Sequence, residues 1–383
     1  MSLPLHLPSP DADALDHSAR LQALIGAEVA GSGWMSFSRY MALALYAPGF
    51  GYYSGALQKF GSGGDFVTAP ELSPLFGRCL AIQLAELMQL SAPHLLEAGA
   101  GSGRLAADLL RELARIGCAP ESYRILELSA DLRARQRALI EREVPALAGR
   151  VEWLDALPER FSGVVFGNEL LDALPVERIR ATADDIEEAG LTVDADGQIA
   201  LSWRVAPPAL ADAARALRLP PGYETELGLA GRAWVAEWAR RIECGALLLI
   251  DYGFPQAEYY HPDRSTGTLM CHYRHHAHAE PLWMPGLCDI TAHVDFTAVA
   301  QSAFDAGLSL AGYTSQASFL LNCGLPALLS DEPEPLARAK RNAEVNRLTS
   351  PAEMGELFKV ICMTRGIAAP LSGFARGDRS HTL

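Results

Sequence analysis

Blocks of apolar residues alternate with amphipathic stretches along the middle of the chain, and this pattern predicts strands that alternate with helices. Residues 95–110 begin with an apolar run that reaches Glu97, continue through three glycines and finish with apolar residues at helical spacing. This order predicts a strand, a tight turn and a helix, the opening unit of a nucleotide-type βαβ fold. Glycines at 99, 101 and 103 would let the backbone adopt positive φ and lie against a ligand.

Three more short strands are predicted downstream, and each ends in acidic or amide side chains. Residues 123–128 contain Glu127 at their end, residues 151–155 end in Asp155, and residues 163–169 end in Asn168 and Glu169. Ligands of open parallel sheets bind outside the carboxyl ends of the strands, so we expect these side chains to line one site. Glu127 lies 24 positions after Gly103, near the roughly 20-residue offset at which a carboxylate binds the ribose hydroxyls.

The rest of the pattern divides the chain into five segments. We expect a disordered tail (1–18), an aromatic and glycine-rich arm (19–72), an α/β core (73–175), an insertion (176–243) and the remainder of the core (244–383). The insertion breaks the alternation and contains a predicted hairpin, with strands at 191–193 and 199–201 around the turn Asp196-Gly197.

Near-continuous apolar runs occur at 246–251, 308–314 and 358–364, and such runs are typical of parallel strands covered on both faces. The expected fold class is therefore α/β, a doubly wound and mostly parallel sheet. It carries an N-terminal arm and an inserted α+β subdomain on the substrate side.

Composition and charge exclude several classes of protein. The net charge is −14, whereas a nucleic-acid partner would require a basic face. The seven cysteines include no C-x-x-C pair, which indicates reduced thiols and a cytosol-like compartment. No apolar run approaches the ~20 residues of a transmembrane helix. The N-terminal residues resemble neither a signal peptide nor a typical transit peptide.

The spacing of the glycines discriminates between nucleotide ligands. A dinucleotide-binding turn reads G-x-G-x-x-G/A and needs a small last residue. Counted from Gly99, that position is Arg104, which disfavours a nucleotide-dependent oxidoreductase. The pattern that starts at Glu97, E-x-G-x-G-x-G, instead resembles the motif of class I methyltransferases that bind S-adenosylmethionine.

Several longer stretches resemble one family, the MidA-type S-adenosylmethionine-dependent methyltransferases. They are GDFVTAPELSPLFG (64–77), EAGAGSGRLAADLL (97–110), GNELLDALPVERI (167–179), LLLIDYGFPQAEYYHPDRSTGTLMCHYRHHAH (247–278), DITAHVDFTAVAQ (289–301) and GYTSQASFLLNCG (312–324). The resemblance implies a class I, Rossmann-like methyltransferase fold and S-adenosylmethionine as the cofactor. Its eukaryotic members are mitochondrial complex I assembly factors that methylate arginine, so it also implies symmetric ω-N methylation of arginine in a protein.

The resemblance and the strand ends together define the expected cofactor site. Glu127 would bind the ribose, and Asp155 would bind the adenine amino group. The complete expected set is Glu97, Gly99, Ala100, Gly101, Gly103, Glu127, Leu128, Asp155, Ala156 and Asn168.

Three carboxylates are candidates for orienting the substrate. A protonated guanidinium has no free lone pair, so a carboxylate that binds it bidentately would draw its charge away from the attacking nitrogen. Glu169 is the first candidate, because it follows Asn168 at a strand end. Asp172 would lie on the same face of a helical turn as Glu169. An equally good alternative is that Asp172 is an acid at a helix N-terminus, where the helix dipole stabilises it. Asp65 would close over the cofactor with its glycine-rich loop, or form an Asx-turn.

Aromatic and imidazole side chains are further candidates on the substrate side. Tyr52 and Tyr53 would stack on the arginine plane, although aromatics in such an arm are more often packing residues. Six of the ten histidines fall between residues 261 and 293, but their spacing matches no zinc-finger pattern, so we expect no metal. His272 or His293 would accept the proton that the methylated nitrogen releases, the alternative being a buried, hydrogen-bonded histidine.

The sequence therefore predicts an S-adenosylmethionine-dependent methyltransferase that acts on arginine in a protein. The resemblance implies a respiratory-complex subunit as the partner, with a cytoplasmic location in a bacterium or the mitochondrial matrix in a eukaryote. Two other functions stay open, a non-catalytic assembly factor that kept the fold and a small-molecule methyltransferase. The intact set of cofactor residues argues against the non-catalytic assembly factor. The insertion and the aromatic arm argue against the small-molecule methyltransferase, because they suit a larger, peptide-like substrate.

Overall fold

The computed structural model describes residues 7–55, 68–194, 197–330 and 335–383. It divides the chain into two compact units, each assembled from segments that are distant in the sequence. Unit 1 comprises residues 1–66, 172–231 and 257–293, and unit 2 comprises residues 67–171, 232–256 and 294–383. Within the described ranges, no helix is both long and apolar enough to cross a membrane.

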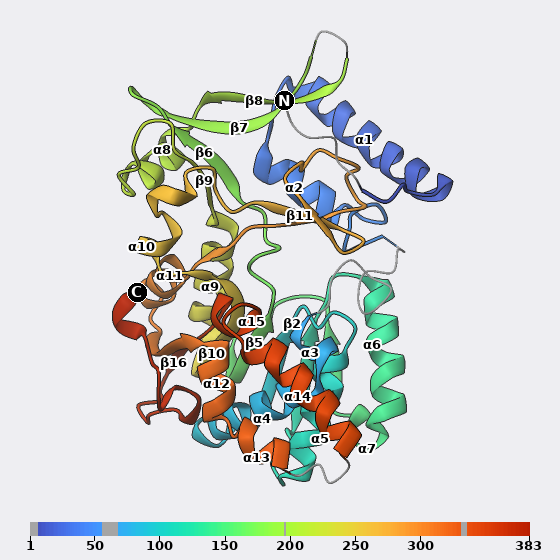
Figure 1. Cartoon of the computed structure of the whole chain (residues 1–383), viewed down its shortest axis with the longest axis vertical. Coiled ribbons are helices and arrows are strands. Elements are labelled where there is room, and N and C mark those ends of the chain that lie inside the picture. Colours follow the sequence, from blue (N-terminus) through green and yellow to red (C-terminus); the bar gives the residue numbers. More distant parts are fainter. Residues whose placement is uncertain (1–6, 56–67, 195–196, 331–334) are drawn as a thin grey trace. The chain divides into compact units, whose positions relative to one another are not determined.

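Unit 2 is built around an eight-stranded sheet in the order β15-β16-β10-β5-β2-β3-β4, and β14 pairs with β10 (Figure 1). The strands are β2 (His94–Ala98), β3 (Ser122–Leu126), β4 (Val151–Leu154), β5 (Phe161–Asn168), β10 (Ile242–Phe254), β14 (Val294–Asp295), β15 (Ser309–Ser315) and β16 (Phe358–Arg365). Neighbours from β10 to β4 are parallel, so the sheet is largely parallel, as predicted.

One strand departs from that prediction, because β16 runs antiparallel to both β10 and β15. Its apolar run at 358–364 was expected to form a parallel strand. Every residue of that run is buried. The apolar run therefore indicates that both faces of the strand are covered, but it does not indicate whether the strand is parallel or antiparallel.

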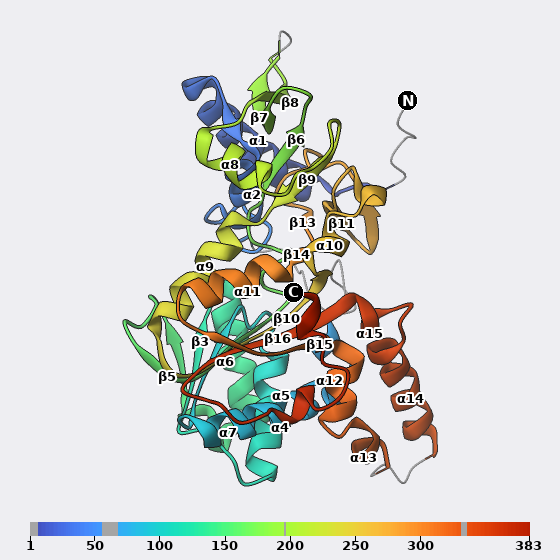
Figure 2. The ribbon, with the colours of Figure 1, turned by 90° about the vertical axis from the view of Figure 1, so that its left-hand side faces the viewer.

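Helices cover both faces of this sheet. α4 (Pro74–Leu90) and α5 (Arg104–Arg115) lie on one side, and α9 (Leu229–Arg241) and α11 (Phe296–Asp305) lie on the other (Figure 2). Also in unit 2 are α3 (Ala69–Leu72), α6 (Ala130–Glu143), α7 (Pro145–Ala148), α12 (Gln316–Asn322), α13 (Leu325–Ser330), α14 (Pro335–Thr349) and α15 (Met354–Leu357).

Two of these helices begin where the sequence predicts. The Ser73 hydroxyl accepts a hydrogen bond from the Leu75 N–H at 3.4 Å at the start of α4, and Pro74 is its first residue. The Ser129 hydroxyl likewise accepts from the Leu132 N–H at 3.4 Å at the start of α6. Each cap satisfies an amide at the helix start that has no partner within the helix.

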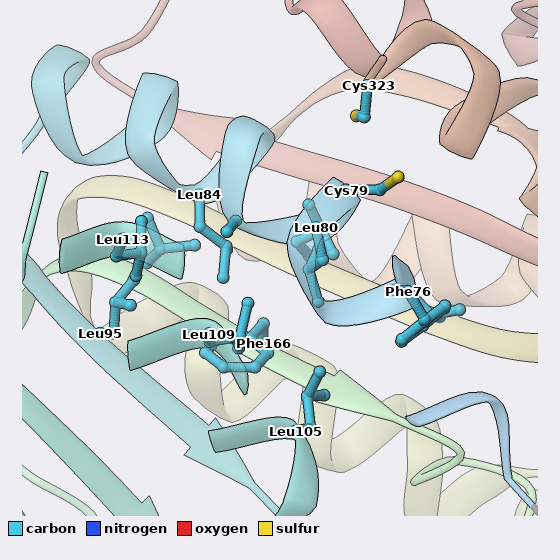
Figure 3. Packing of buried hydrophobic residues seen from close by; sticks show 14 of the residues in the cluster. Phe76, Cys79, Leu80, Leu84, Leu95, Leu105, Leu109, Leu113, Phe166 and Cys323 are labelled. Carbon is cyan, nitrogen blue, oxygen red and sulfur yellow. The ribbon is translucent and has the colours of Figure 1, made fainter. Parts of the chain in front are cut away.

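The core of unit 2 lies between the sheet and the helices α4 and α5. Leu84 of α4, Leu109 of α5, Leu95 of β2 and Phe166 of β5 belong to one buried cluster (Figure 3). Because both faces of the central strands are covered by apolar side chains, polar groups are confined to the strand ends. The carboxyl ends of β2, β3, β4 and β5 are therefore where a polar ligand site can form.

Unit 1 contains an antiparallel sheet in the order β1-β7-β6-β9, with β8 paired to β7. Its strands are β1 (Met35–Ser36), β6 (Glu177–Ala181), β7 (Ile186–Val193), β8 (Ile199–Val205) and β9 (Glu224–Leu227). A second sheet joins β11 (Met270–Tyr273) to β12 (His276–His278) and β13 (Asp289–Thr291). The helices are α1 (Ala12–Ser32), α2 (Phe37–Tyr46), α8 (Pro208–Arg215) and α10 (Gln256–Tyr259), whose first residue belongs to unit 2.

The core of unit 1 gathers residues from all three of its segments. Leu21 and Ile25 of α1, Tyr40 of α2, Leu191 of β7 and Ile290 of β13 belong to one buried cluster. The three segments are therefore held together by contacts between residues that are distant in the sequence. A local sequence pattern cannot predict such contacts.

The structure confirms the predicted hairpin and changes other expectations for unit 1. Residue Val193 of β7 faces Ile199 of β8, although Asp196 of the predicted turn lies outside the described residues. Residues 12–18, expected to be disordered, form the first turns of α1, where the Asp11 carboxylate accepts the Ala14 N–H at 2.9 Å. Residues 257–293, expected in the core, belong to unit 1.

Candidate functional site

The glycine turn of unit 2 has the predicted form. It connects β2 to α5, and its glycines have φ values of +70° at Gly99, +52° at Gly101 and +84° at Gly103. These left-handed conformations favour glycine over other residues. The Gly99 N–H donates to the Leu126 carbonyl at 3.0 Å, which ties the turn to the end of β3.

Glu97 lies at the start of this turn and is buried, with 2% of its surface exposed. Its Oε2 accepts a hydrogen bond from the Tyr123 hydroxyl at 2.6 Å. Burial raises the pKa of Glu97 to about 7, although the Tyr123 hydrogen bond lowers it and the charge of Glu127 raises it further. This carboxyl can therefore change protonation near neutral pH.

Glu127 follows β3 and presents a buried carboxylate at the strand end, as predicted. Oε1 accepts the Ser129 N–H at 2.9 Å, and Oε2 accepts a hydrogen bond from Gln136 Nε2 at 3.2 Å. Burial raises its pKa, against hydrogen bonds from Ser129 and Gln136 that lower it. Because a carboxylate oxygen can accept two hydrogen bonds, Oε2 can bind Gln136 and still accept one from a hydroxyl.

The next residue, Leu128, is 80% exposed although it follows a buried strand. Single exposed apolar side chains are common on protein surfaces, so it is the position of Leu128 beside the Glu127 carboxylate that would let it contact a flat aromatic ligand. Ala156, after β4, is also exposed. Both were predicted as cofactor-binding residues.

Asp155 has a different environment from the other predicted carboxylates. Its side chain is 90% exposed and forms an ion pair with Arg133 at 2.5 Å. Arg133 also donates from Nε to the Glu127 carbonyl and from Nη2 to the Leu154 carbonyl. A single arginine of α6 thus binds the ends of both β3 and β4, and Asp155 completes its hydrogen bonds.

Asn168 and Glu169 occupy the end of β5. Asn168 Nδ2 donates to Glu169 Oε1 at 2.9 Å, and Asn168 Oδ1 is buried without a hydrogen-bond donor in the described part of the chain. Glu169 has φ +52° although it is not glycine, and its N–H donates to the Ile250 carbonyl at 2.8 Å. Such a conformation persists only where the surroundings hold it, and functional sites are one place where it occurs.

Asp251, which the sequence analysis did not select, holds this loop. Its carboxylate is 1% exposed, and Oδ2 accepts the N–H groups of Leu170 at 3.1 Å and Leu171 at 2.8 Å. The sequence contained the same signal as for Glu97 and Glu127, an acid that ends an apolar run. The strand order places β10 beside β5, so Asp251 lies next to the loop that follows β5.

A second overlooked acid lies at the glycine turn. Glu71 of α3 accepts a hydrogen bond from the Ser102 hydroxyl, and Ser102 lies between Gly101 and Gly103. Ala100, predicted as a cofactor-binding residue, is buried in the same turn.

The predicted residues of unit 1 form a separate group. The Tyr53 hydroxyl donates to Asp289 Oδ1 at 2.9 Å, and its ring stacks on Tyr46 with centroids 5.5 Å apart. Burial raises the pKa of Tyr53, and the charges of Asp289 and Asp172 raise it further. Unit 1 thus brings Asp172 and Tyr53 together, with Asp289 as an acid that sequence reasoning missed. Tyr52 is 2% exposed and packs edge-on against Tyr53.

The two candidate histidines lie in unit 1. His272 lies on β11, and the His293 N–H donates to the Thr268 hydroxyl at 3.0 Å. Over the part of the chain that the structure describes, no three His, Cys, Asp or Glu residues are grouped so that they could hold a metal ion. Asp65 lies outside the described residues.

The residues of unit 2 fit the polar groups of S-adenosylmethionine. The glycine turn gives close backbone approach, Glu127 offers acceptors for two ribose hydroxyls, and Leu128 offers an exposed apolar face. The buried Asn168 Oδ1 is an acceptor for which the described residues provide no donor. Glu97, the turn, Glu127 and Asn168 would hold this cofactor.

Comparisons with known proteins agree with this fit. Residues 79–314 match the model of a family of S-adenosyl-L-methionine-dependent methyltransferases. The chain is 30% identical to the mitochondrial protein arginine methyltransferase NDUFAF7 of Mus musculus, with 86% of this chain and 81% of the mouse protein covered. It is also 30% identical to the Drosophila melanogaster homologue, with 98% and 93% covered.

A solved structure of a COG1565 superfamily member from Burkholderia thailandensis, bound to S-adenosyl-homocysteine, has the same fold. It is 50% identical, with a TM-score of 0.95, and the alignment covers 98% of this chain and 100% of that one.

Proposed function

Because the chain belongs to this family of S-adenosyl-L-methionine-dependent methyltransferases, we propose that it methylates an ω-nitrogen of arginine in a protein. The relatives named protein arginine methyltransferases support the substrate class. The net charge of −14 suits a basic substrate. Symmetric dimethylation and a target among respiratory-complex subunits are the finer parts of the proposal, and they rest on the family resemblance.

Within this proposal, unit 2 binds the cofactor. Glu127 accepts hydrogen bonds from the ribose hydroxyls, and Leu128 covers one face of the adenine. The turn from Gly99 to Gly103 brings the backbone against the amino-acid end. Asp155 and Ala156 would hold the adenine, although the Asp155 carboxylate already binds Arg133. When bound, the cofactor supplies a methyl group on a positively charged sulfur.

Glu169 is the proposed substrate carboxylate. The substrate guanidinium is protonated, with no free lone pair for attack, and a facing carboxylate draws its charge toward the far nitrogens. Asn168 holds Glu169 Oε1 through its amide, so the carboxylate has a fixed orientation. Positioning of this kind supplies most of the rate enhancement in a direct displacement. Asp172, Tyr52 and Tyr53 stay predictions for arginine recognition, and His272 or His293 stays a prediction for the group that accepts the released proton.

The observation that carries the proposal is the conformation of Glu169. A left-handed non-glycine residue costs about 1–2 kcal/mol, so it persists only where contacts hold it. Here Asp251 binds the two amides that follow, and Asn168 binds the side chain. This arrangement restrains a carboxylate at the carboxyl end of the central strand, which is where ligands of such sheets bind.

The test is a methylation assay with S-adenosylmethionine that carries a labelled methyl group. The purified chain is incubated with soluble proteins of its source organism, and the proteins are hydrolysed and analysed for methylated arginines. We expect label in arginine derivatives, and symmetric dimethylarginine as the final product. Glu169→Gln should lower the rate about 100-fold or more while S-adenosylhomocysteine binds with unchanged affinity.

Glu141→Gln, which changes an exposed glutamate of α6, is the matched control and should keep the full rate. Label confined to small molecules would overturn the protein substrate. If Glu169→Gln keeps the full rate, another carboxylate orients the substrate guanidinium, and Asp172 and Asp65 are the next candidates.

A further inference from the structure

Gln136 is a fully buried glutamine on α6, with 0% of its surface exposed. Its Nε2 donates to the Gly101 carbonyl at 2.9 Å and to Glu127 Oε2 at 3.2 Å. Its Oε1 accepts a hydrogen bond from Trp153 Nε1 at 2.8 Å. One side chain therefore joins the glycine turn, the acid after β3 and the strand β4.

The chemistry of these partners fixes the orientation of the amide. The indole N–H of Trp153 can only donate, so it requires the amide oxygen. The Gly101 carbonyl and the Glu127 carboxylate only accept, so they require the amide nitrogen. Rotating the amide by half a turn would oppose like groups at all three contacts, and the buried amide of Gln136 would then lose its three partners.

Backbone packing places Gln136 against the turn as well. A Cβ at Gly103 would lie 3.1 Å from Gln136 Cα and 3.2 Å from its Cγ. The turn and the helix therefore approach so closely that a side chain at this position would push the helix back by a few tenths of an ångström, and the φ of +84° also favours glycine here. Because the amide group cannot move away from the turn, it restrains Glu127 relative to Gly101.

We propose that Gln136 is a positioning residue for the cofactor, which holds the Glu127 carboxylate in register with the glycine turn so that both contact the same ligand. Gln136 donates to one oxygen of Glu127, and the Ser129 N–H donates to the other. Two donors from different directions prevent rotation of the carboxylate about its last bond. The ribose hydroxyls then meet acceptors that are already oriented, which lowers the entropy lost on binding.

This inference rests on the proposed role of Glu127 at the ribose. Glu127→Gln therefore tests the premise by itself, and the effect of Gln136 is measured relative to it. The experiment is calorimetry of S-adenosylhomocysteine binding to the wild type, Gln136→Met, Glu127→Gln and the double variant. Gln301→Met, on the exposed surface of α11, is the matched control.

We expect Gln136→Met to weaken binding about tenfold, because one hydrogen bond to a charged group is lost. In the Glu127→Gln background the same change should weaken binding by about twofold or less, since the group it positions has been altered. Equal losses in both backgrounds, or no loss in a folded Gln136→Met, would overturn the proposal. If Glu127→Gln alone has no effect, the ribose assignment fails instead.

Gln136→Glu is the second variant, because it keeps the size of the side chain and the acceptor for Trp153. The charged groups around it are Glu127 and Glu97 at the strand ends, Arg133 and Arg137 on α6, and Asp155, which pairs with Arg133. Its new carboxyl can donate to Glu127 only while it keeps its proton. We expect the ratio of the dissociation constants of this variant and the wild type to rise from about pH 6 to about pH 9, as that proton is lost and like charges face each other.

A side chain that packed in the core without acting on Glu127 would leave this ratio nearly independent of pH. A constant ratio, in a variant whose melting temperature matches the wild type, would therefore contradict the positioning role.

Discussion

The two units place buried charge in different ways. In unit 2 the buried carboxylates Glu97, Glu127 and Asp251 lie at or beside the carboxyl ends of strands. In unit 1 the charges lie along the strands and pair across them, as Arg178 does with Glu224 and Arg180 with Glu187.

The difference follows from how each sheet is covered. A parallel strand that is buried on both faces excludes charge from its middle, so a buried acid in it lies near an end. Towards the edge of the sheet, where side chains are more exposed, Arg124 of β3 and Glu152 of β4 form an ion pair at 3.5 Å. An antiparallel sheet with a partly exposed face accepts charged pairs, which bind each other and stabilise the sheet. A buried acid near the carboxyl end of a parallel strand is therefore evidence for a site, whereas an acid that pairs with an arginine of the neighbouring strand is not.

The largest expected effect is the loss of stability when one buried phenylalanine is removed from the core of each unit. Phe166→Ala removes a ring from the core of unit 2, and Phe37→Ala removes one from the core of unit 1. Each should lower the free energy of unfolding by about 3–5 kcal/mol, as measured by urea denaturation. Only Phe166→Ala should also weaken S-adenosylhomocysteine binding, because Phe166 lies two residues before Asn168 on β5. An equal loss of affinity in folded Phe37→Ala would remove the functional distinction between the units.

The next effect concerns the protonation of Glu97. Its pKa is raised in the folded chain to about 7 from 4.5, so the folded state binds the proton more tightly than the unfolded state. Stability should therefore fall as pH rises through this interval, by about 3 kcal/mol in total. Urea denaturation across the interval should show this slope in the wild type, and a flatter profile in Glu97→Gln. Identical profiles would mean that Glu97 does not titrate there.

The smallest effect concerns the exposed Leu128. Leu128→Ser should leave the free energy of unfolding within about 0.5 kcal/mol of the wild type, because the side chain is 80% exposed. It should weaken S-adenosylhomocysteine binding by about 1–2 kcal/mol in calorimetry, as the apolar face for adenine is lost. Val205→Ser is the matched control, since Val205 is a 62% exposed apolar residue of unit 1. Unchanged affinity in Leu128→Ser would place the adenine elsewhere.

Elements formed by neighbouring residues could be predicted from the sequence. The turn between β2 and α5 follows from glycines at alternate positions, and the caps of α4 and α6 follow from Ser73 and Ser129. The hairpin of β7 and β8 follows from alternating residues around a glycine. In each case the determining interactions span only a few residues, so the local pattern contains them.

The candidate site could be predicted only in part for the same reason. Glu97, Glu127 and Asn168 are visible because each ends a strand. The partners that orient them come from elsewhere, as Asp251 lies 80 positions from Leu171 and Gln136 lies 35 positions from Gly101. A polar residue inside a helix or at the end of another strand has no local sequence feature that identifies its hydrogen-bond partner.

The sequence by itself determined the strand, turn and helix units, the acids at the strand ends and the family to which they belong. Only the tertiary structure decided that β16 is antiparallel, that residues 257–293 join unit 1, that Gln136 binds Glu127 and that Asp251 binds the loop after β5. The physical reason is the range of the interactions. Backbone conformation and capping act between near neighbours, whereas strand order and buried hydrogen bonds join residues that come together only when the chain is folded.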